Sequence, residues 1–158
     1  MSKQIYLSFP GRNAHGIIDL YWDNAPVTCE SIWQGLAQPL QIKPMHSMFV
    51  GPEIAMVVPQ DRRSFGGDKI PPESQSSYPL AGELLWVYQP AYARKGAADA
   101  LWEIGMFYDF GGRLFGPTGW FAANVFGRMT KGLDEIAAAC RSLRTEGQQP
   151  IELGRVKA

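Results

Sequence analysis

The chain has 158 residues, of which 46% are hydrophobic, and its 15 basic residues balance 15 acidic ones. This length suits a single domain, residues 1–158, that can bury a core of its own. The even charge argues against a nucleic-acid partner, which normally requires a basic excess, and the lack of an apolar run near 18 residues argues against a membrane span. Two cysteines and no signal-like start predict a reduced, cytoplasmic protein.

The chain begins with a predicted β-hairpin and a short helix. Residues 4–9 alternate apolar and polar side chains, and residues 15–24 supply a second apolar run after a Pro-Gly turn. Pro26 suits the first position of a helix. The apolar stripe of that helix consists of Cys29, Ile32, Trp33 and Leu36. Its spacing predicts that Cys29 is a core residue rather than a nucleophile.

Two strands and a long polar segment follow. Residues 40–50 and 53–58 are predicted as strands separated by Gly51-Pro52. Pro44 inside the first of them indicates an edge or a bulge, because proline cannot donate to a β-ladder. Residues 60–82 are rich in Ser, Pro and Gly, and loops of this length are usually functional, ordered on the surface or mobile.

The second half of the chain contains three predicted strands, followed by one clear helix. The predicted strands begin at Gly82, Trp102 and Trp120, a helix covers 133–143, and a last strand lies near the C-terminus. About eight short strands and two helices predict a mainly β protein, a sandwich or a barrel. A closed barrel is favoured because closure removes exposed edge strands.

Several motifs in this order resemble one known family. They are APVTCESIWQGL, MHSMFVGPE, SSYPLAGELLWV, GMFYDF and GPTGWFAANVFGRM. The series resembles a bacterial cyclophilin-like family catalogued as a domain of unknown function, over about residues 6–156, and its most specific part is 120–128. The resemblance implies a closed, mainly antiparallel barrel of about eight strands flanked by two α-helices.

The sequence departs from its relatives at informative places. Phe49 stands where the family usually has tryptophan, and the segments 60–72 and 92–100 are longer than expected. The F-H-R motif of true cyclophilins is missing, so the resemblance does not transfer prolyl-isomerase activity.

His46 and Glu53 are the candidate catalytic pair. A carboxylate across the turn could orient the imidazole and make it a general base. Alternatively, His46 is a barrel histidine bonded to the backbone or a carboxylate, and Glu53 is a charge at the rim.

Tyr108, Asn124 and Arg128 are the candidate ligand-binding residues. Tyr108 could present its hydroxyl to a ligand, or be a core tyrosine. Asn124 and Arg128 are four residues apart, so they would share a face of a strand and could grip a carboxylate or amide. Alternatively, Arg128 fixes the C-terminal helix through its carbonyls or Asp134.

Other classes of site lack their motifs. The sequence contains neither glycine-rich phosphate-loop pattern nor paired His and Cys spacing, so no cofactor and no metal are expected. We expect a small-molecule site at the barrel mouth that binds, and could transform by hydrolysis or proton transfer, a small carboxylate or amide. The alternatives are a peptidyl-prolyl isomerase or peptide-binding module, and a structural homo-oligomer or interaction protein.

Overall fold

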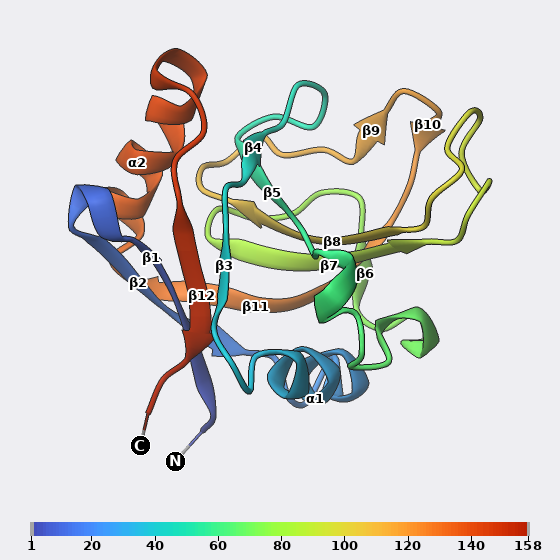
Figure 1. The fold of residues 1–158 in the computed structure, drawn as a ribbon, viewed down its shortest axis with the longest axis horizontal. Helices are drawn as coiled ribbons and strands as arrows, with labels where there is room; N and C mark the ends of the chain where they lie inside the picture. Colours follow the sequence, from blue (N-terminus) through green and yellow to red (C-terminus); the bar gives the residue numbers. More distant parts are fainter. Residues whose placement is uncertain (1, 158) are drawn as a thin grey trace.

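The computed structural model describes residues 2–157, which form a strongly curled antiparallel sheet with two α-helices (Figure 1). The strands are β1 (Gln4–Phe9), β2 (Ala14–Leu20), β3 (Leu40–Ile42), β4 (Met45–His46), β5 (Glu53–Val57), β6 (Gln75–Ser76), β7 (Glu83–Gln89), β8 (Leu101–Phe107), β9 (Phe115–Gly116), β10 (Gly119–Trp120), β11 (Ala123–Lys131) and β12 (Ile151–Arg155). The helices are α1 (Pro26–Gly35) and α2 (Leu133–Glu146), with 3-10 turns at Pro10–Arg12, Gln60–Arg62 and Gly67–Lys69.

The sheet is a half-barrel whose two edges are not joined by hydrogen bonds. Its order is β3-β12-β1-β2-β11-β7-β8-β5-β4, with β6 beside β11, and β9 and β10 form a separate pair. The edge strands β3 and β4 are consecutive in the chain and are linked by Lys43 and Pro44. The predicted closure is therefore wrong. Within residues 2–157, β3 and β4 are joined covalently but do not form a ladder with each other.

The number of strands also differs from the expected eight. The strand predicted over residues 40–50 divides at Pro44 into the short β3 and β4, which confirms that this proline marks an edge. Two-residue strands such as β6 and β9 were not predicted, because pieces of that length carry no periodicity.

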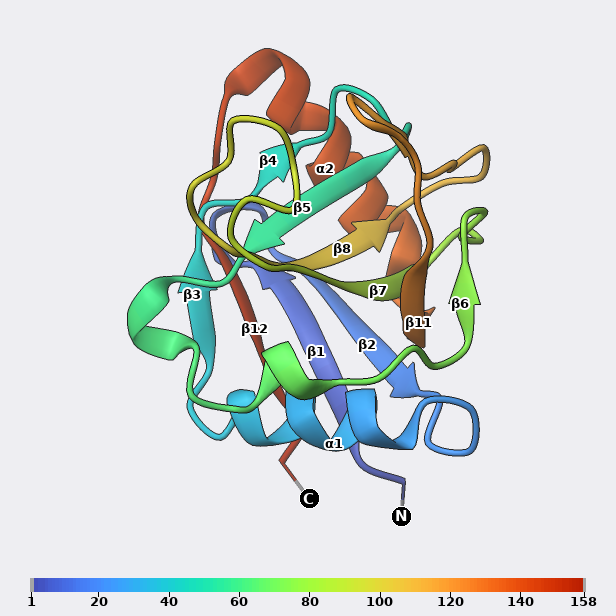
Figure 2. The same cartoon turned by 90° about the vertical axis from the view of Figure 1, so that its right-hand side faces the viewer.

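Both predicted helices are confirmed, and they pack against the main core. Pro26 begins α1, and Gly147, at φ 84°, follows the end of α2. The two helices lie at opposite ends of the curled sheet (Figures 1 and 2). Cys29 and Cys140 are fully buried there. Burial raises the pKa of the Cys29 thiol to about 12, which supports its assignment to the core.

A second, smaller apolar layer covers the opposite face of the β7–β8 region. Its buried members include Leu85, Val87, Phe107 and Leu114. The segment that carries β9 and β10 lies over β7 and β8 on the side away from α1 (Figures 1 and 2). This part of the sheet is therefore covered on both faces, and the second layer contains the candidate site.

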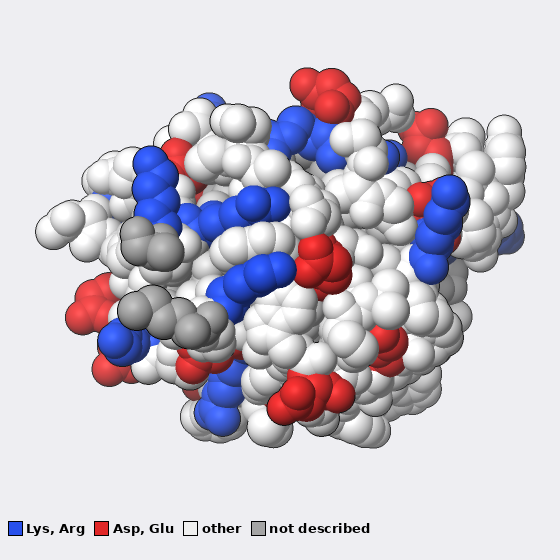
Figure 3. Space-filling model, turned by 90° about the horizontal axis from the view of Figure 1, so that it is seen from below, with Lys and Arg blue, Asp and Glu red and all other residues white. Residues whose placement is uncertain are grey.

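The surface carries both signs of charge. On the face seen from the α1 side, basic and acidic side chains are interspersed (Figure 3). None of the helices in residues 2–157 combines the length and apolar character needed to cross a membrane.

Candidate functional site

Strands β5, β7 and β8 form the floor of a cavity on the second face of the sheet. Ala55 pairs with Gly105, Gly105 with Leu85, and Val87 with Glu103. Residues that pair directly across neighbouring strands share one face of a sheet. These side chains therefore project together, away from the main core.

The cavity has a volume of about 320 Å³. Its apolar walls include Leu85, Val87, Leu101, Leu114 and Phe121. Its polar groups include Glu53, Gln89, Arg94 and Glu103. We call it the Glu53 cavity. Mainly apolar walls with a few polar groups are the usual composition of small-molecule sites.

Glu53 is a buried carboxyl group inside this cavity. Its side chain is only 4% exposed, and the hydrogen bonds among residues 2–157 include none to its carboxyl oxygens. Burial, followed by the negative charge of Glu103, raises its pKa well above the ordinary value. The raised pKa widens the pH range over which the Glu53 carboxyl is neutral, and a neutral carboxyl can donate as well as accept a hydrogen bond.

Gly105 makes room for this carboxyl. A Cβ atom at Gly105 would lie 2.8 Å from Glu53 Oε2 and 3.0 Å from Leu85 Cδ1. Real Cβ atoms do not approach that closely, so any side chain here would displace the carboxyl. The close approach of the Glu53 carboxyl thus explains why this apolar strand contains a glycine at position 105.

A second carboxyl, an arginine and an amide lie towards the far end of the same floor. Burial raises the pKa of Glu103, while the positive charge of Arg94 opposes the rise. Arg94 Nε and Gln89 Oε1 are buried and have no hydrogen-bond partner among the described residues. Buried polar atoms are normally paired, so these two atoms indicate an incomplete site.

His46 lies at the border of the cavity, and Tyr108, which lines the neighbouring pocket, holds its imidazole. His46 Nε2 is 2.7 Å from the Tyr108 hydroxyl, and Nδ1 is 2.8 Å from the carbonyl oxygen of Ser47. Tyr108 is buried, and burial raises the pKa of its hydroxyl. His46 and Tyr108 thus contact each other, and their predicted catalytic and ligand-binding roles stay predictions.

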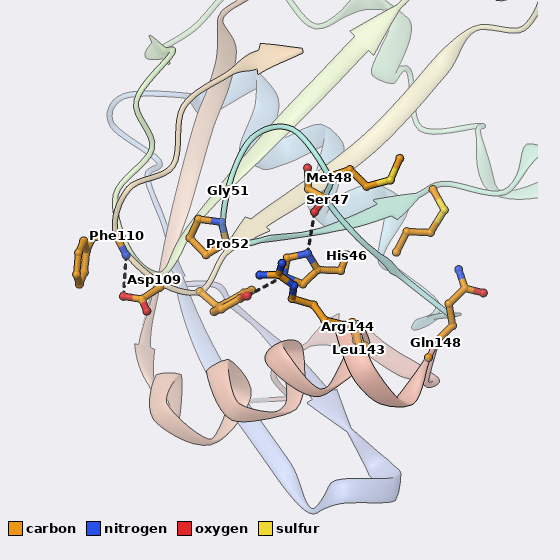
Figure 4. Close-up of a pocket in the computed structure, with 13 residues that line it drawn as sticks. His46, Ser47, Met48, Gly51, Pro52, Asp109, Phe110, Leu143, Arg144 and Gln148 are labelled. Atoms are coloured by element: carbon orange, nitrogen blue, oxygen red, sulfur yellow. Dashed lines mark hydrogen bonds between the residues drawn. The ribbon is translucent and has the colours of Figure 1, made fainter. Parts of the chain in front are cut away.

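His46 also borders a second, more open pocket of about 760 Å³ (Figure 4). In this view its ring lies between Ser47 and the α2 residues Leu143 and Arg144. Asp109 lies on the other side, where it accepts a hydrogen bond from Arg141 and one from the backbone N–H of Phe110. The segment 45–48 therefore separates an open pocket from the Glu53 cavity, since it lines both.

The expected contact between His46 and the Glu53 carboxylate is absent from residues 2–157. The β4–β5 ladder pairs His46 with Ile54, so His46 and Glu53 start from opposite faces. Tyr108 and Ser47 orient the imidazole instead. The predicted general-base pair is wrong in this respect, although both residues border the cavity.

Asn124 is a structural junction within the described chain. Its Nδ2 donates to Thr28 Oγ1 and to the carbonyl oxygen of Pro71, and its Oδ1 accepts from Glu73 N and Gln75 Nε2. These bonds use both donors and both acceptor sites of the amide. They fasten the long segment 60–82 to α1 and β11, and the predicted ligand contact of Asn124 stays a prediction.

Arg128 is exposed and does not share a face with Asn124. Asn124 pairs with Trp86, whereas Arg128 pairs with Glu83, because a register shift lies between Val125 and Gly127. Such a bulge reverses the alternation of side chains. The expectation that the two residues project together is therefore wrong. Arg128 Nε donates to the carbonyl oxygen of Ala81 instead.

Several residues of the cavity were missed by sequence reasoning. Glu103 alternates with Trp102 and Ile104 in an apolar strand, which is a readable sign of a carboxyl placed on a covered face. Gln89 ends β7 and Arg94 lies within the loop between β7 and β8, and no local pattern indicates that this loop folds over the sheet. Within residues 2–157, no group of three His, Cys, Asp or Glu side chains is placed to hold a metal ion.

Two solved structures share this architecture. McbB in complex with tryptophan matches with a TM-score of 0.72 and 15% identity, over 98% of this chain and 45% of the McbB chain. The Mimivirus cyclophilin matches with a TM-score of 0.54 and 12% identity, over 98% of this chain and 89% of that chain. At these identities the likeness shows the fold alone.

This chain spans less than half the length of McbB. No curated protein matches the sequence. A family model described as a protein of unknown function (DUF3830) matches residues 7–155. The cyclophilin-like fold and this match together confirm the resemblance seen in the sequence, and the chain belongs to the DUF3830 family.

Proposed function

We propose that the chain binds a small organic molecule in the Glu53 cavity and that Glu53 exchanges a proton with it. The observation that carries the proposal is a nearly buried carboxyl, without a hydrogen-bond partner in residues 2–157, inside a cavity with apolar walls. Such a group costs free energy unless a ligand or another polar atom pairs with it. Unpaired buried polar groups and shifted pKa values gather at functional sites.

The chemistry of the cavity suits acid–base transfer. Burial raises the pKa of Glu53, which suits a group that donates a proton and then serves as the base that recovers it. The proton would leave a Glu53 carboxyl oxygen for a nitrogen or oxygen of the bound molecule. His46, held by Tyr108 at the border, is a second group able to exchange protons.

The apolar walls point to a ligand with an aromatic or aliphatic body and one polar group. McbB, a structural neighbour of this chain, was solved in complex with tryptophan, which supports a ligand with an aromatic body. Small carboxylates and amides, the classes expected from the sequence, and amines are all of suitable size. The cyclophilin likeness supports the fold and gives no observation that favours prolyl isomerisation.

Three ring-matched probes test this proposal: benzylamine, benzamide and benzoate. Ligand-observed NMR detects weak binding to the wild-type chain, and an Ala55→Phe variant fills the cavity from its floor. We expect at least one probe to bind the wild type and none to bind Ala55→Phe, with circular dichroism showing that the variant is folded. Glu135→Gln, an exposed change on α2, is the control that should bind like the wild type.

Two results would contradict the proposal. One is the failure of every probe to bind the wild-type chain. The other is binding that persists unchanged in folded Ala55→Phe, which would place the probe outside the Glu53 cavity.

A further inference from the structure

The charged groups of the Glu53 cavity are unevenly placed along its floor. Glu103 lies four residues along β8 from Phe107, the partner of Glu53 in the β5–β8 ladder. Ala55 and Gly105, which pair with each other, occupy the floor between the backbone positions of Glu53 and Glu103. The Glu53 carboxyl reaches over Gly105, where a Cβ atom would lie 2.8 Å from its Oε2, so it is the carboxyl nearest the middle of the floor.

One of these carboxyls has a compensating cation and the other does not. Arg94 lines the cavity, and its charge acts on Glu103. The only charged group that perturbs Glu53 is another carboxyl, that of Glu103. Among the groups that line the cavity, the two carboxyls face a single guanidinium, with His46 at the border. When both carboxyls are ionised, the cavity therefore lacks one positive charge.

The unpaired polar atoms of the cavity also favour a ligand that donates hydrogen bonds. Both oxygens of Glu53 are acceptors when the group is ionised, and no described residue donates a hydrogen bond to them; Gln89 Oε1, towards the far end of the floor, is a separate buried acceptor without a partner among the described residues. A ligand that satisfies these atoms must supply N–H or O–H donors. An ammonium group has three such donors and also the missing charge.

We propose that the ligand of the Glu53 cavity carries a protonated amine, which binds at the Glu53 carboxylate while its apolar body packs on Leu85, Val87 and Phe121. This inference rests on the proposed function and names the ligand class of the same site. The free amine takes the Glu53 proton inside the cavity and leaves an ammonium beside a carboxylate. Because the amine is already an ammonium in solution, the net result is the release of one proton to solvent per bound amine. An anionic ligand meets two carboxyls, and a neutral amide leaves the charge deficit in place.

Isothermal titration with the three ring-matched probes tests the amine directly. We expect benzylammonium to bind at least about tenfold more tightly than benzamide or benzoate. Titrations in two buffers of different ionisation enthalpy should show the release of up to about one proton per bound amine. The affinity should rise with pH by up to about tenfold per unit until Glu53 is ionised.

Glu53→Gln keeps the shape of the side chain and removes its charge. This variant should bind benzylammonium at least about tenfold more weakly than the wild type and should release no proton, whereas the surface control Glu135→Gln should match the wild type. Equal or tighter binding of benzamide or benzoate, or unchanged amine affinity in Glu53→Gln, would contradict the proposal that the ligand is an amine. Neither result would contradict binding of a small molecule in the Glu53 cavity. Absence of binding by all three probes would overturn the cavity itself.

Discussion

The Glu53 carboxyl occupies the space above Gly105, so a side chain added at Gly105 should destabilise the fold. In Gly105→Ala the new Cβ would lie 2.8 Å from Glu53 Oε2, and one of the two atoms must move. Overpacking of this kind typically costs about 1–3 kcal/mol. Gly105 is not among the positive-φ glycines, so alanine can adopt its backbone conformation. Alanine also lowers the conformational entropy of the unfolded chain, which should stabilise the fold by about 0.4–1 kcal/mol and offset part of the cost. We expect a net loss of about 1–2 kcal/mol in the free energy of unfolding.

A double-mutant cycle isolates the contact. In a Glu53→Ala background the close oxygen is gone and only Leu85 Cδ1, at 3.0 Å, needs a small shift. Gly105→Ala should then be nearly neutral, so the two changes should couple by about 1–2 kcal/mol. Urea denaturation of the four proteins, followed by circular dichroism, measures this energy. Gly11→Ala is the matched control, since a Cβ there meets nothing within 4 Å.

Additive costs would refute the reasoning. If Gly105→Ala destabilises the wild type and the Glu53→Ala background equally, within about 0.3 kcal/mol, the Glu53 carboxyl does not lie over Gly105. The Glu53 cavity would then lack its central group.

Three further predictions concern the rest of the molecule. The folded chain holds the Glu53 proton more tightly than the unfolded chain, because the pKa of Glu53 is raised in the fold. The contribution of Glu53 to the free energy of unfolding is therefore fully present below about pH 4.3. It is lost as the pH rises through the raised folded pKa, by up to about 1.4 kcal/mol per pH unit. Glu53→Gln should flatten this dependence in urea titrations, and an unchanged slope would argue against it. Burial raises the pKa of both Cys29 and Cys140, so a thiol reagent should modify them much more slowly in the folded chain than in urea; fast labelling of the folded chain would contradict this. Asn124→Ala should lower the free energy of unfolding by about 2–4 kcal/mol and Arg128→Ala by no more than about 0.5 kcal/mol, and similar losses would contradict their different burial.

The fold was largely predictable because its long elements carry clear patterns. The N-terminal hairpin and both helices have the expected periodicity and turn residues, and they occur where predicted. Closure of the barrel was not predictable in the same way. It depends on whether the edges β3 and β4 pair, and a local signal such as Pro44 indicates an edge without showing what lies beside it.

The candidate site was predicted less completely, for two physical reasons. A bulge between Val125 and Gly127 reverses the side-chain alternation that was expected to bring Asn124 and Arg128 together. Glu103 and Arg94 line the same cavity only because a loop folds over the second face of the sheet, and such long-range placement leaves no periodic signature. His46 and Glu53 both line the cavity, but the partner of His46 is Tyr108, and the predicted catalytic roles of the pair stay predictions.

The most direct test of the account is an NMR titration of the Glu53 side-chain carboxyl carbon in the free protein, assigned by its loss in Glu53→Gln. The account predicts that this carbon titrates well above the ordinary glutamate value of about 4.3, and that saturating benzylammonium moves its midpoint down. A Glu53 signal that titrates with the exposed glutamates, and does not respond to the amine, would contradict the claim that a buried neutral carboxyl is the ligand-binding group of this cavity.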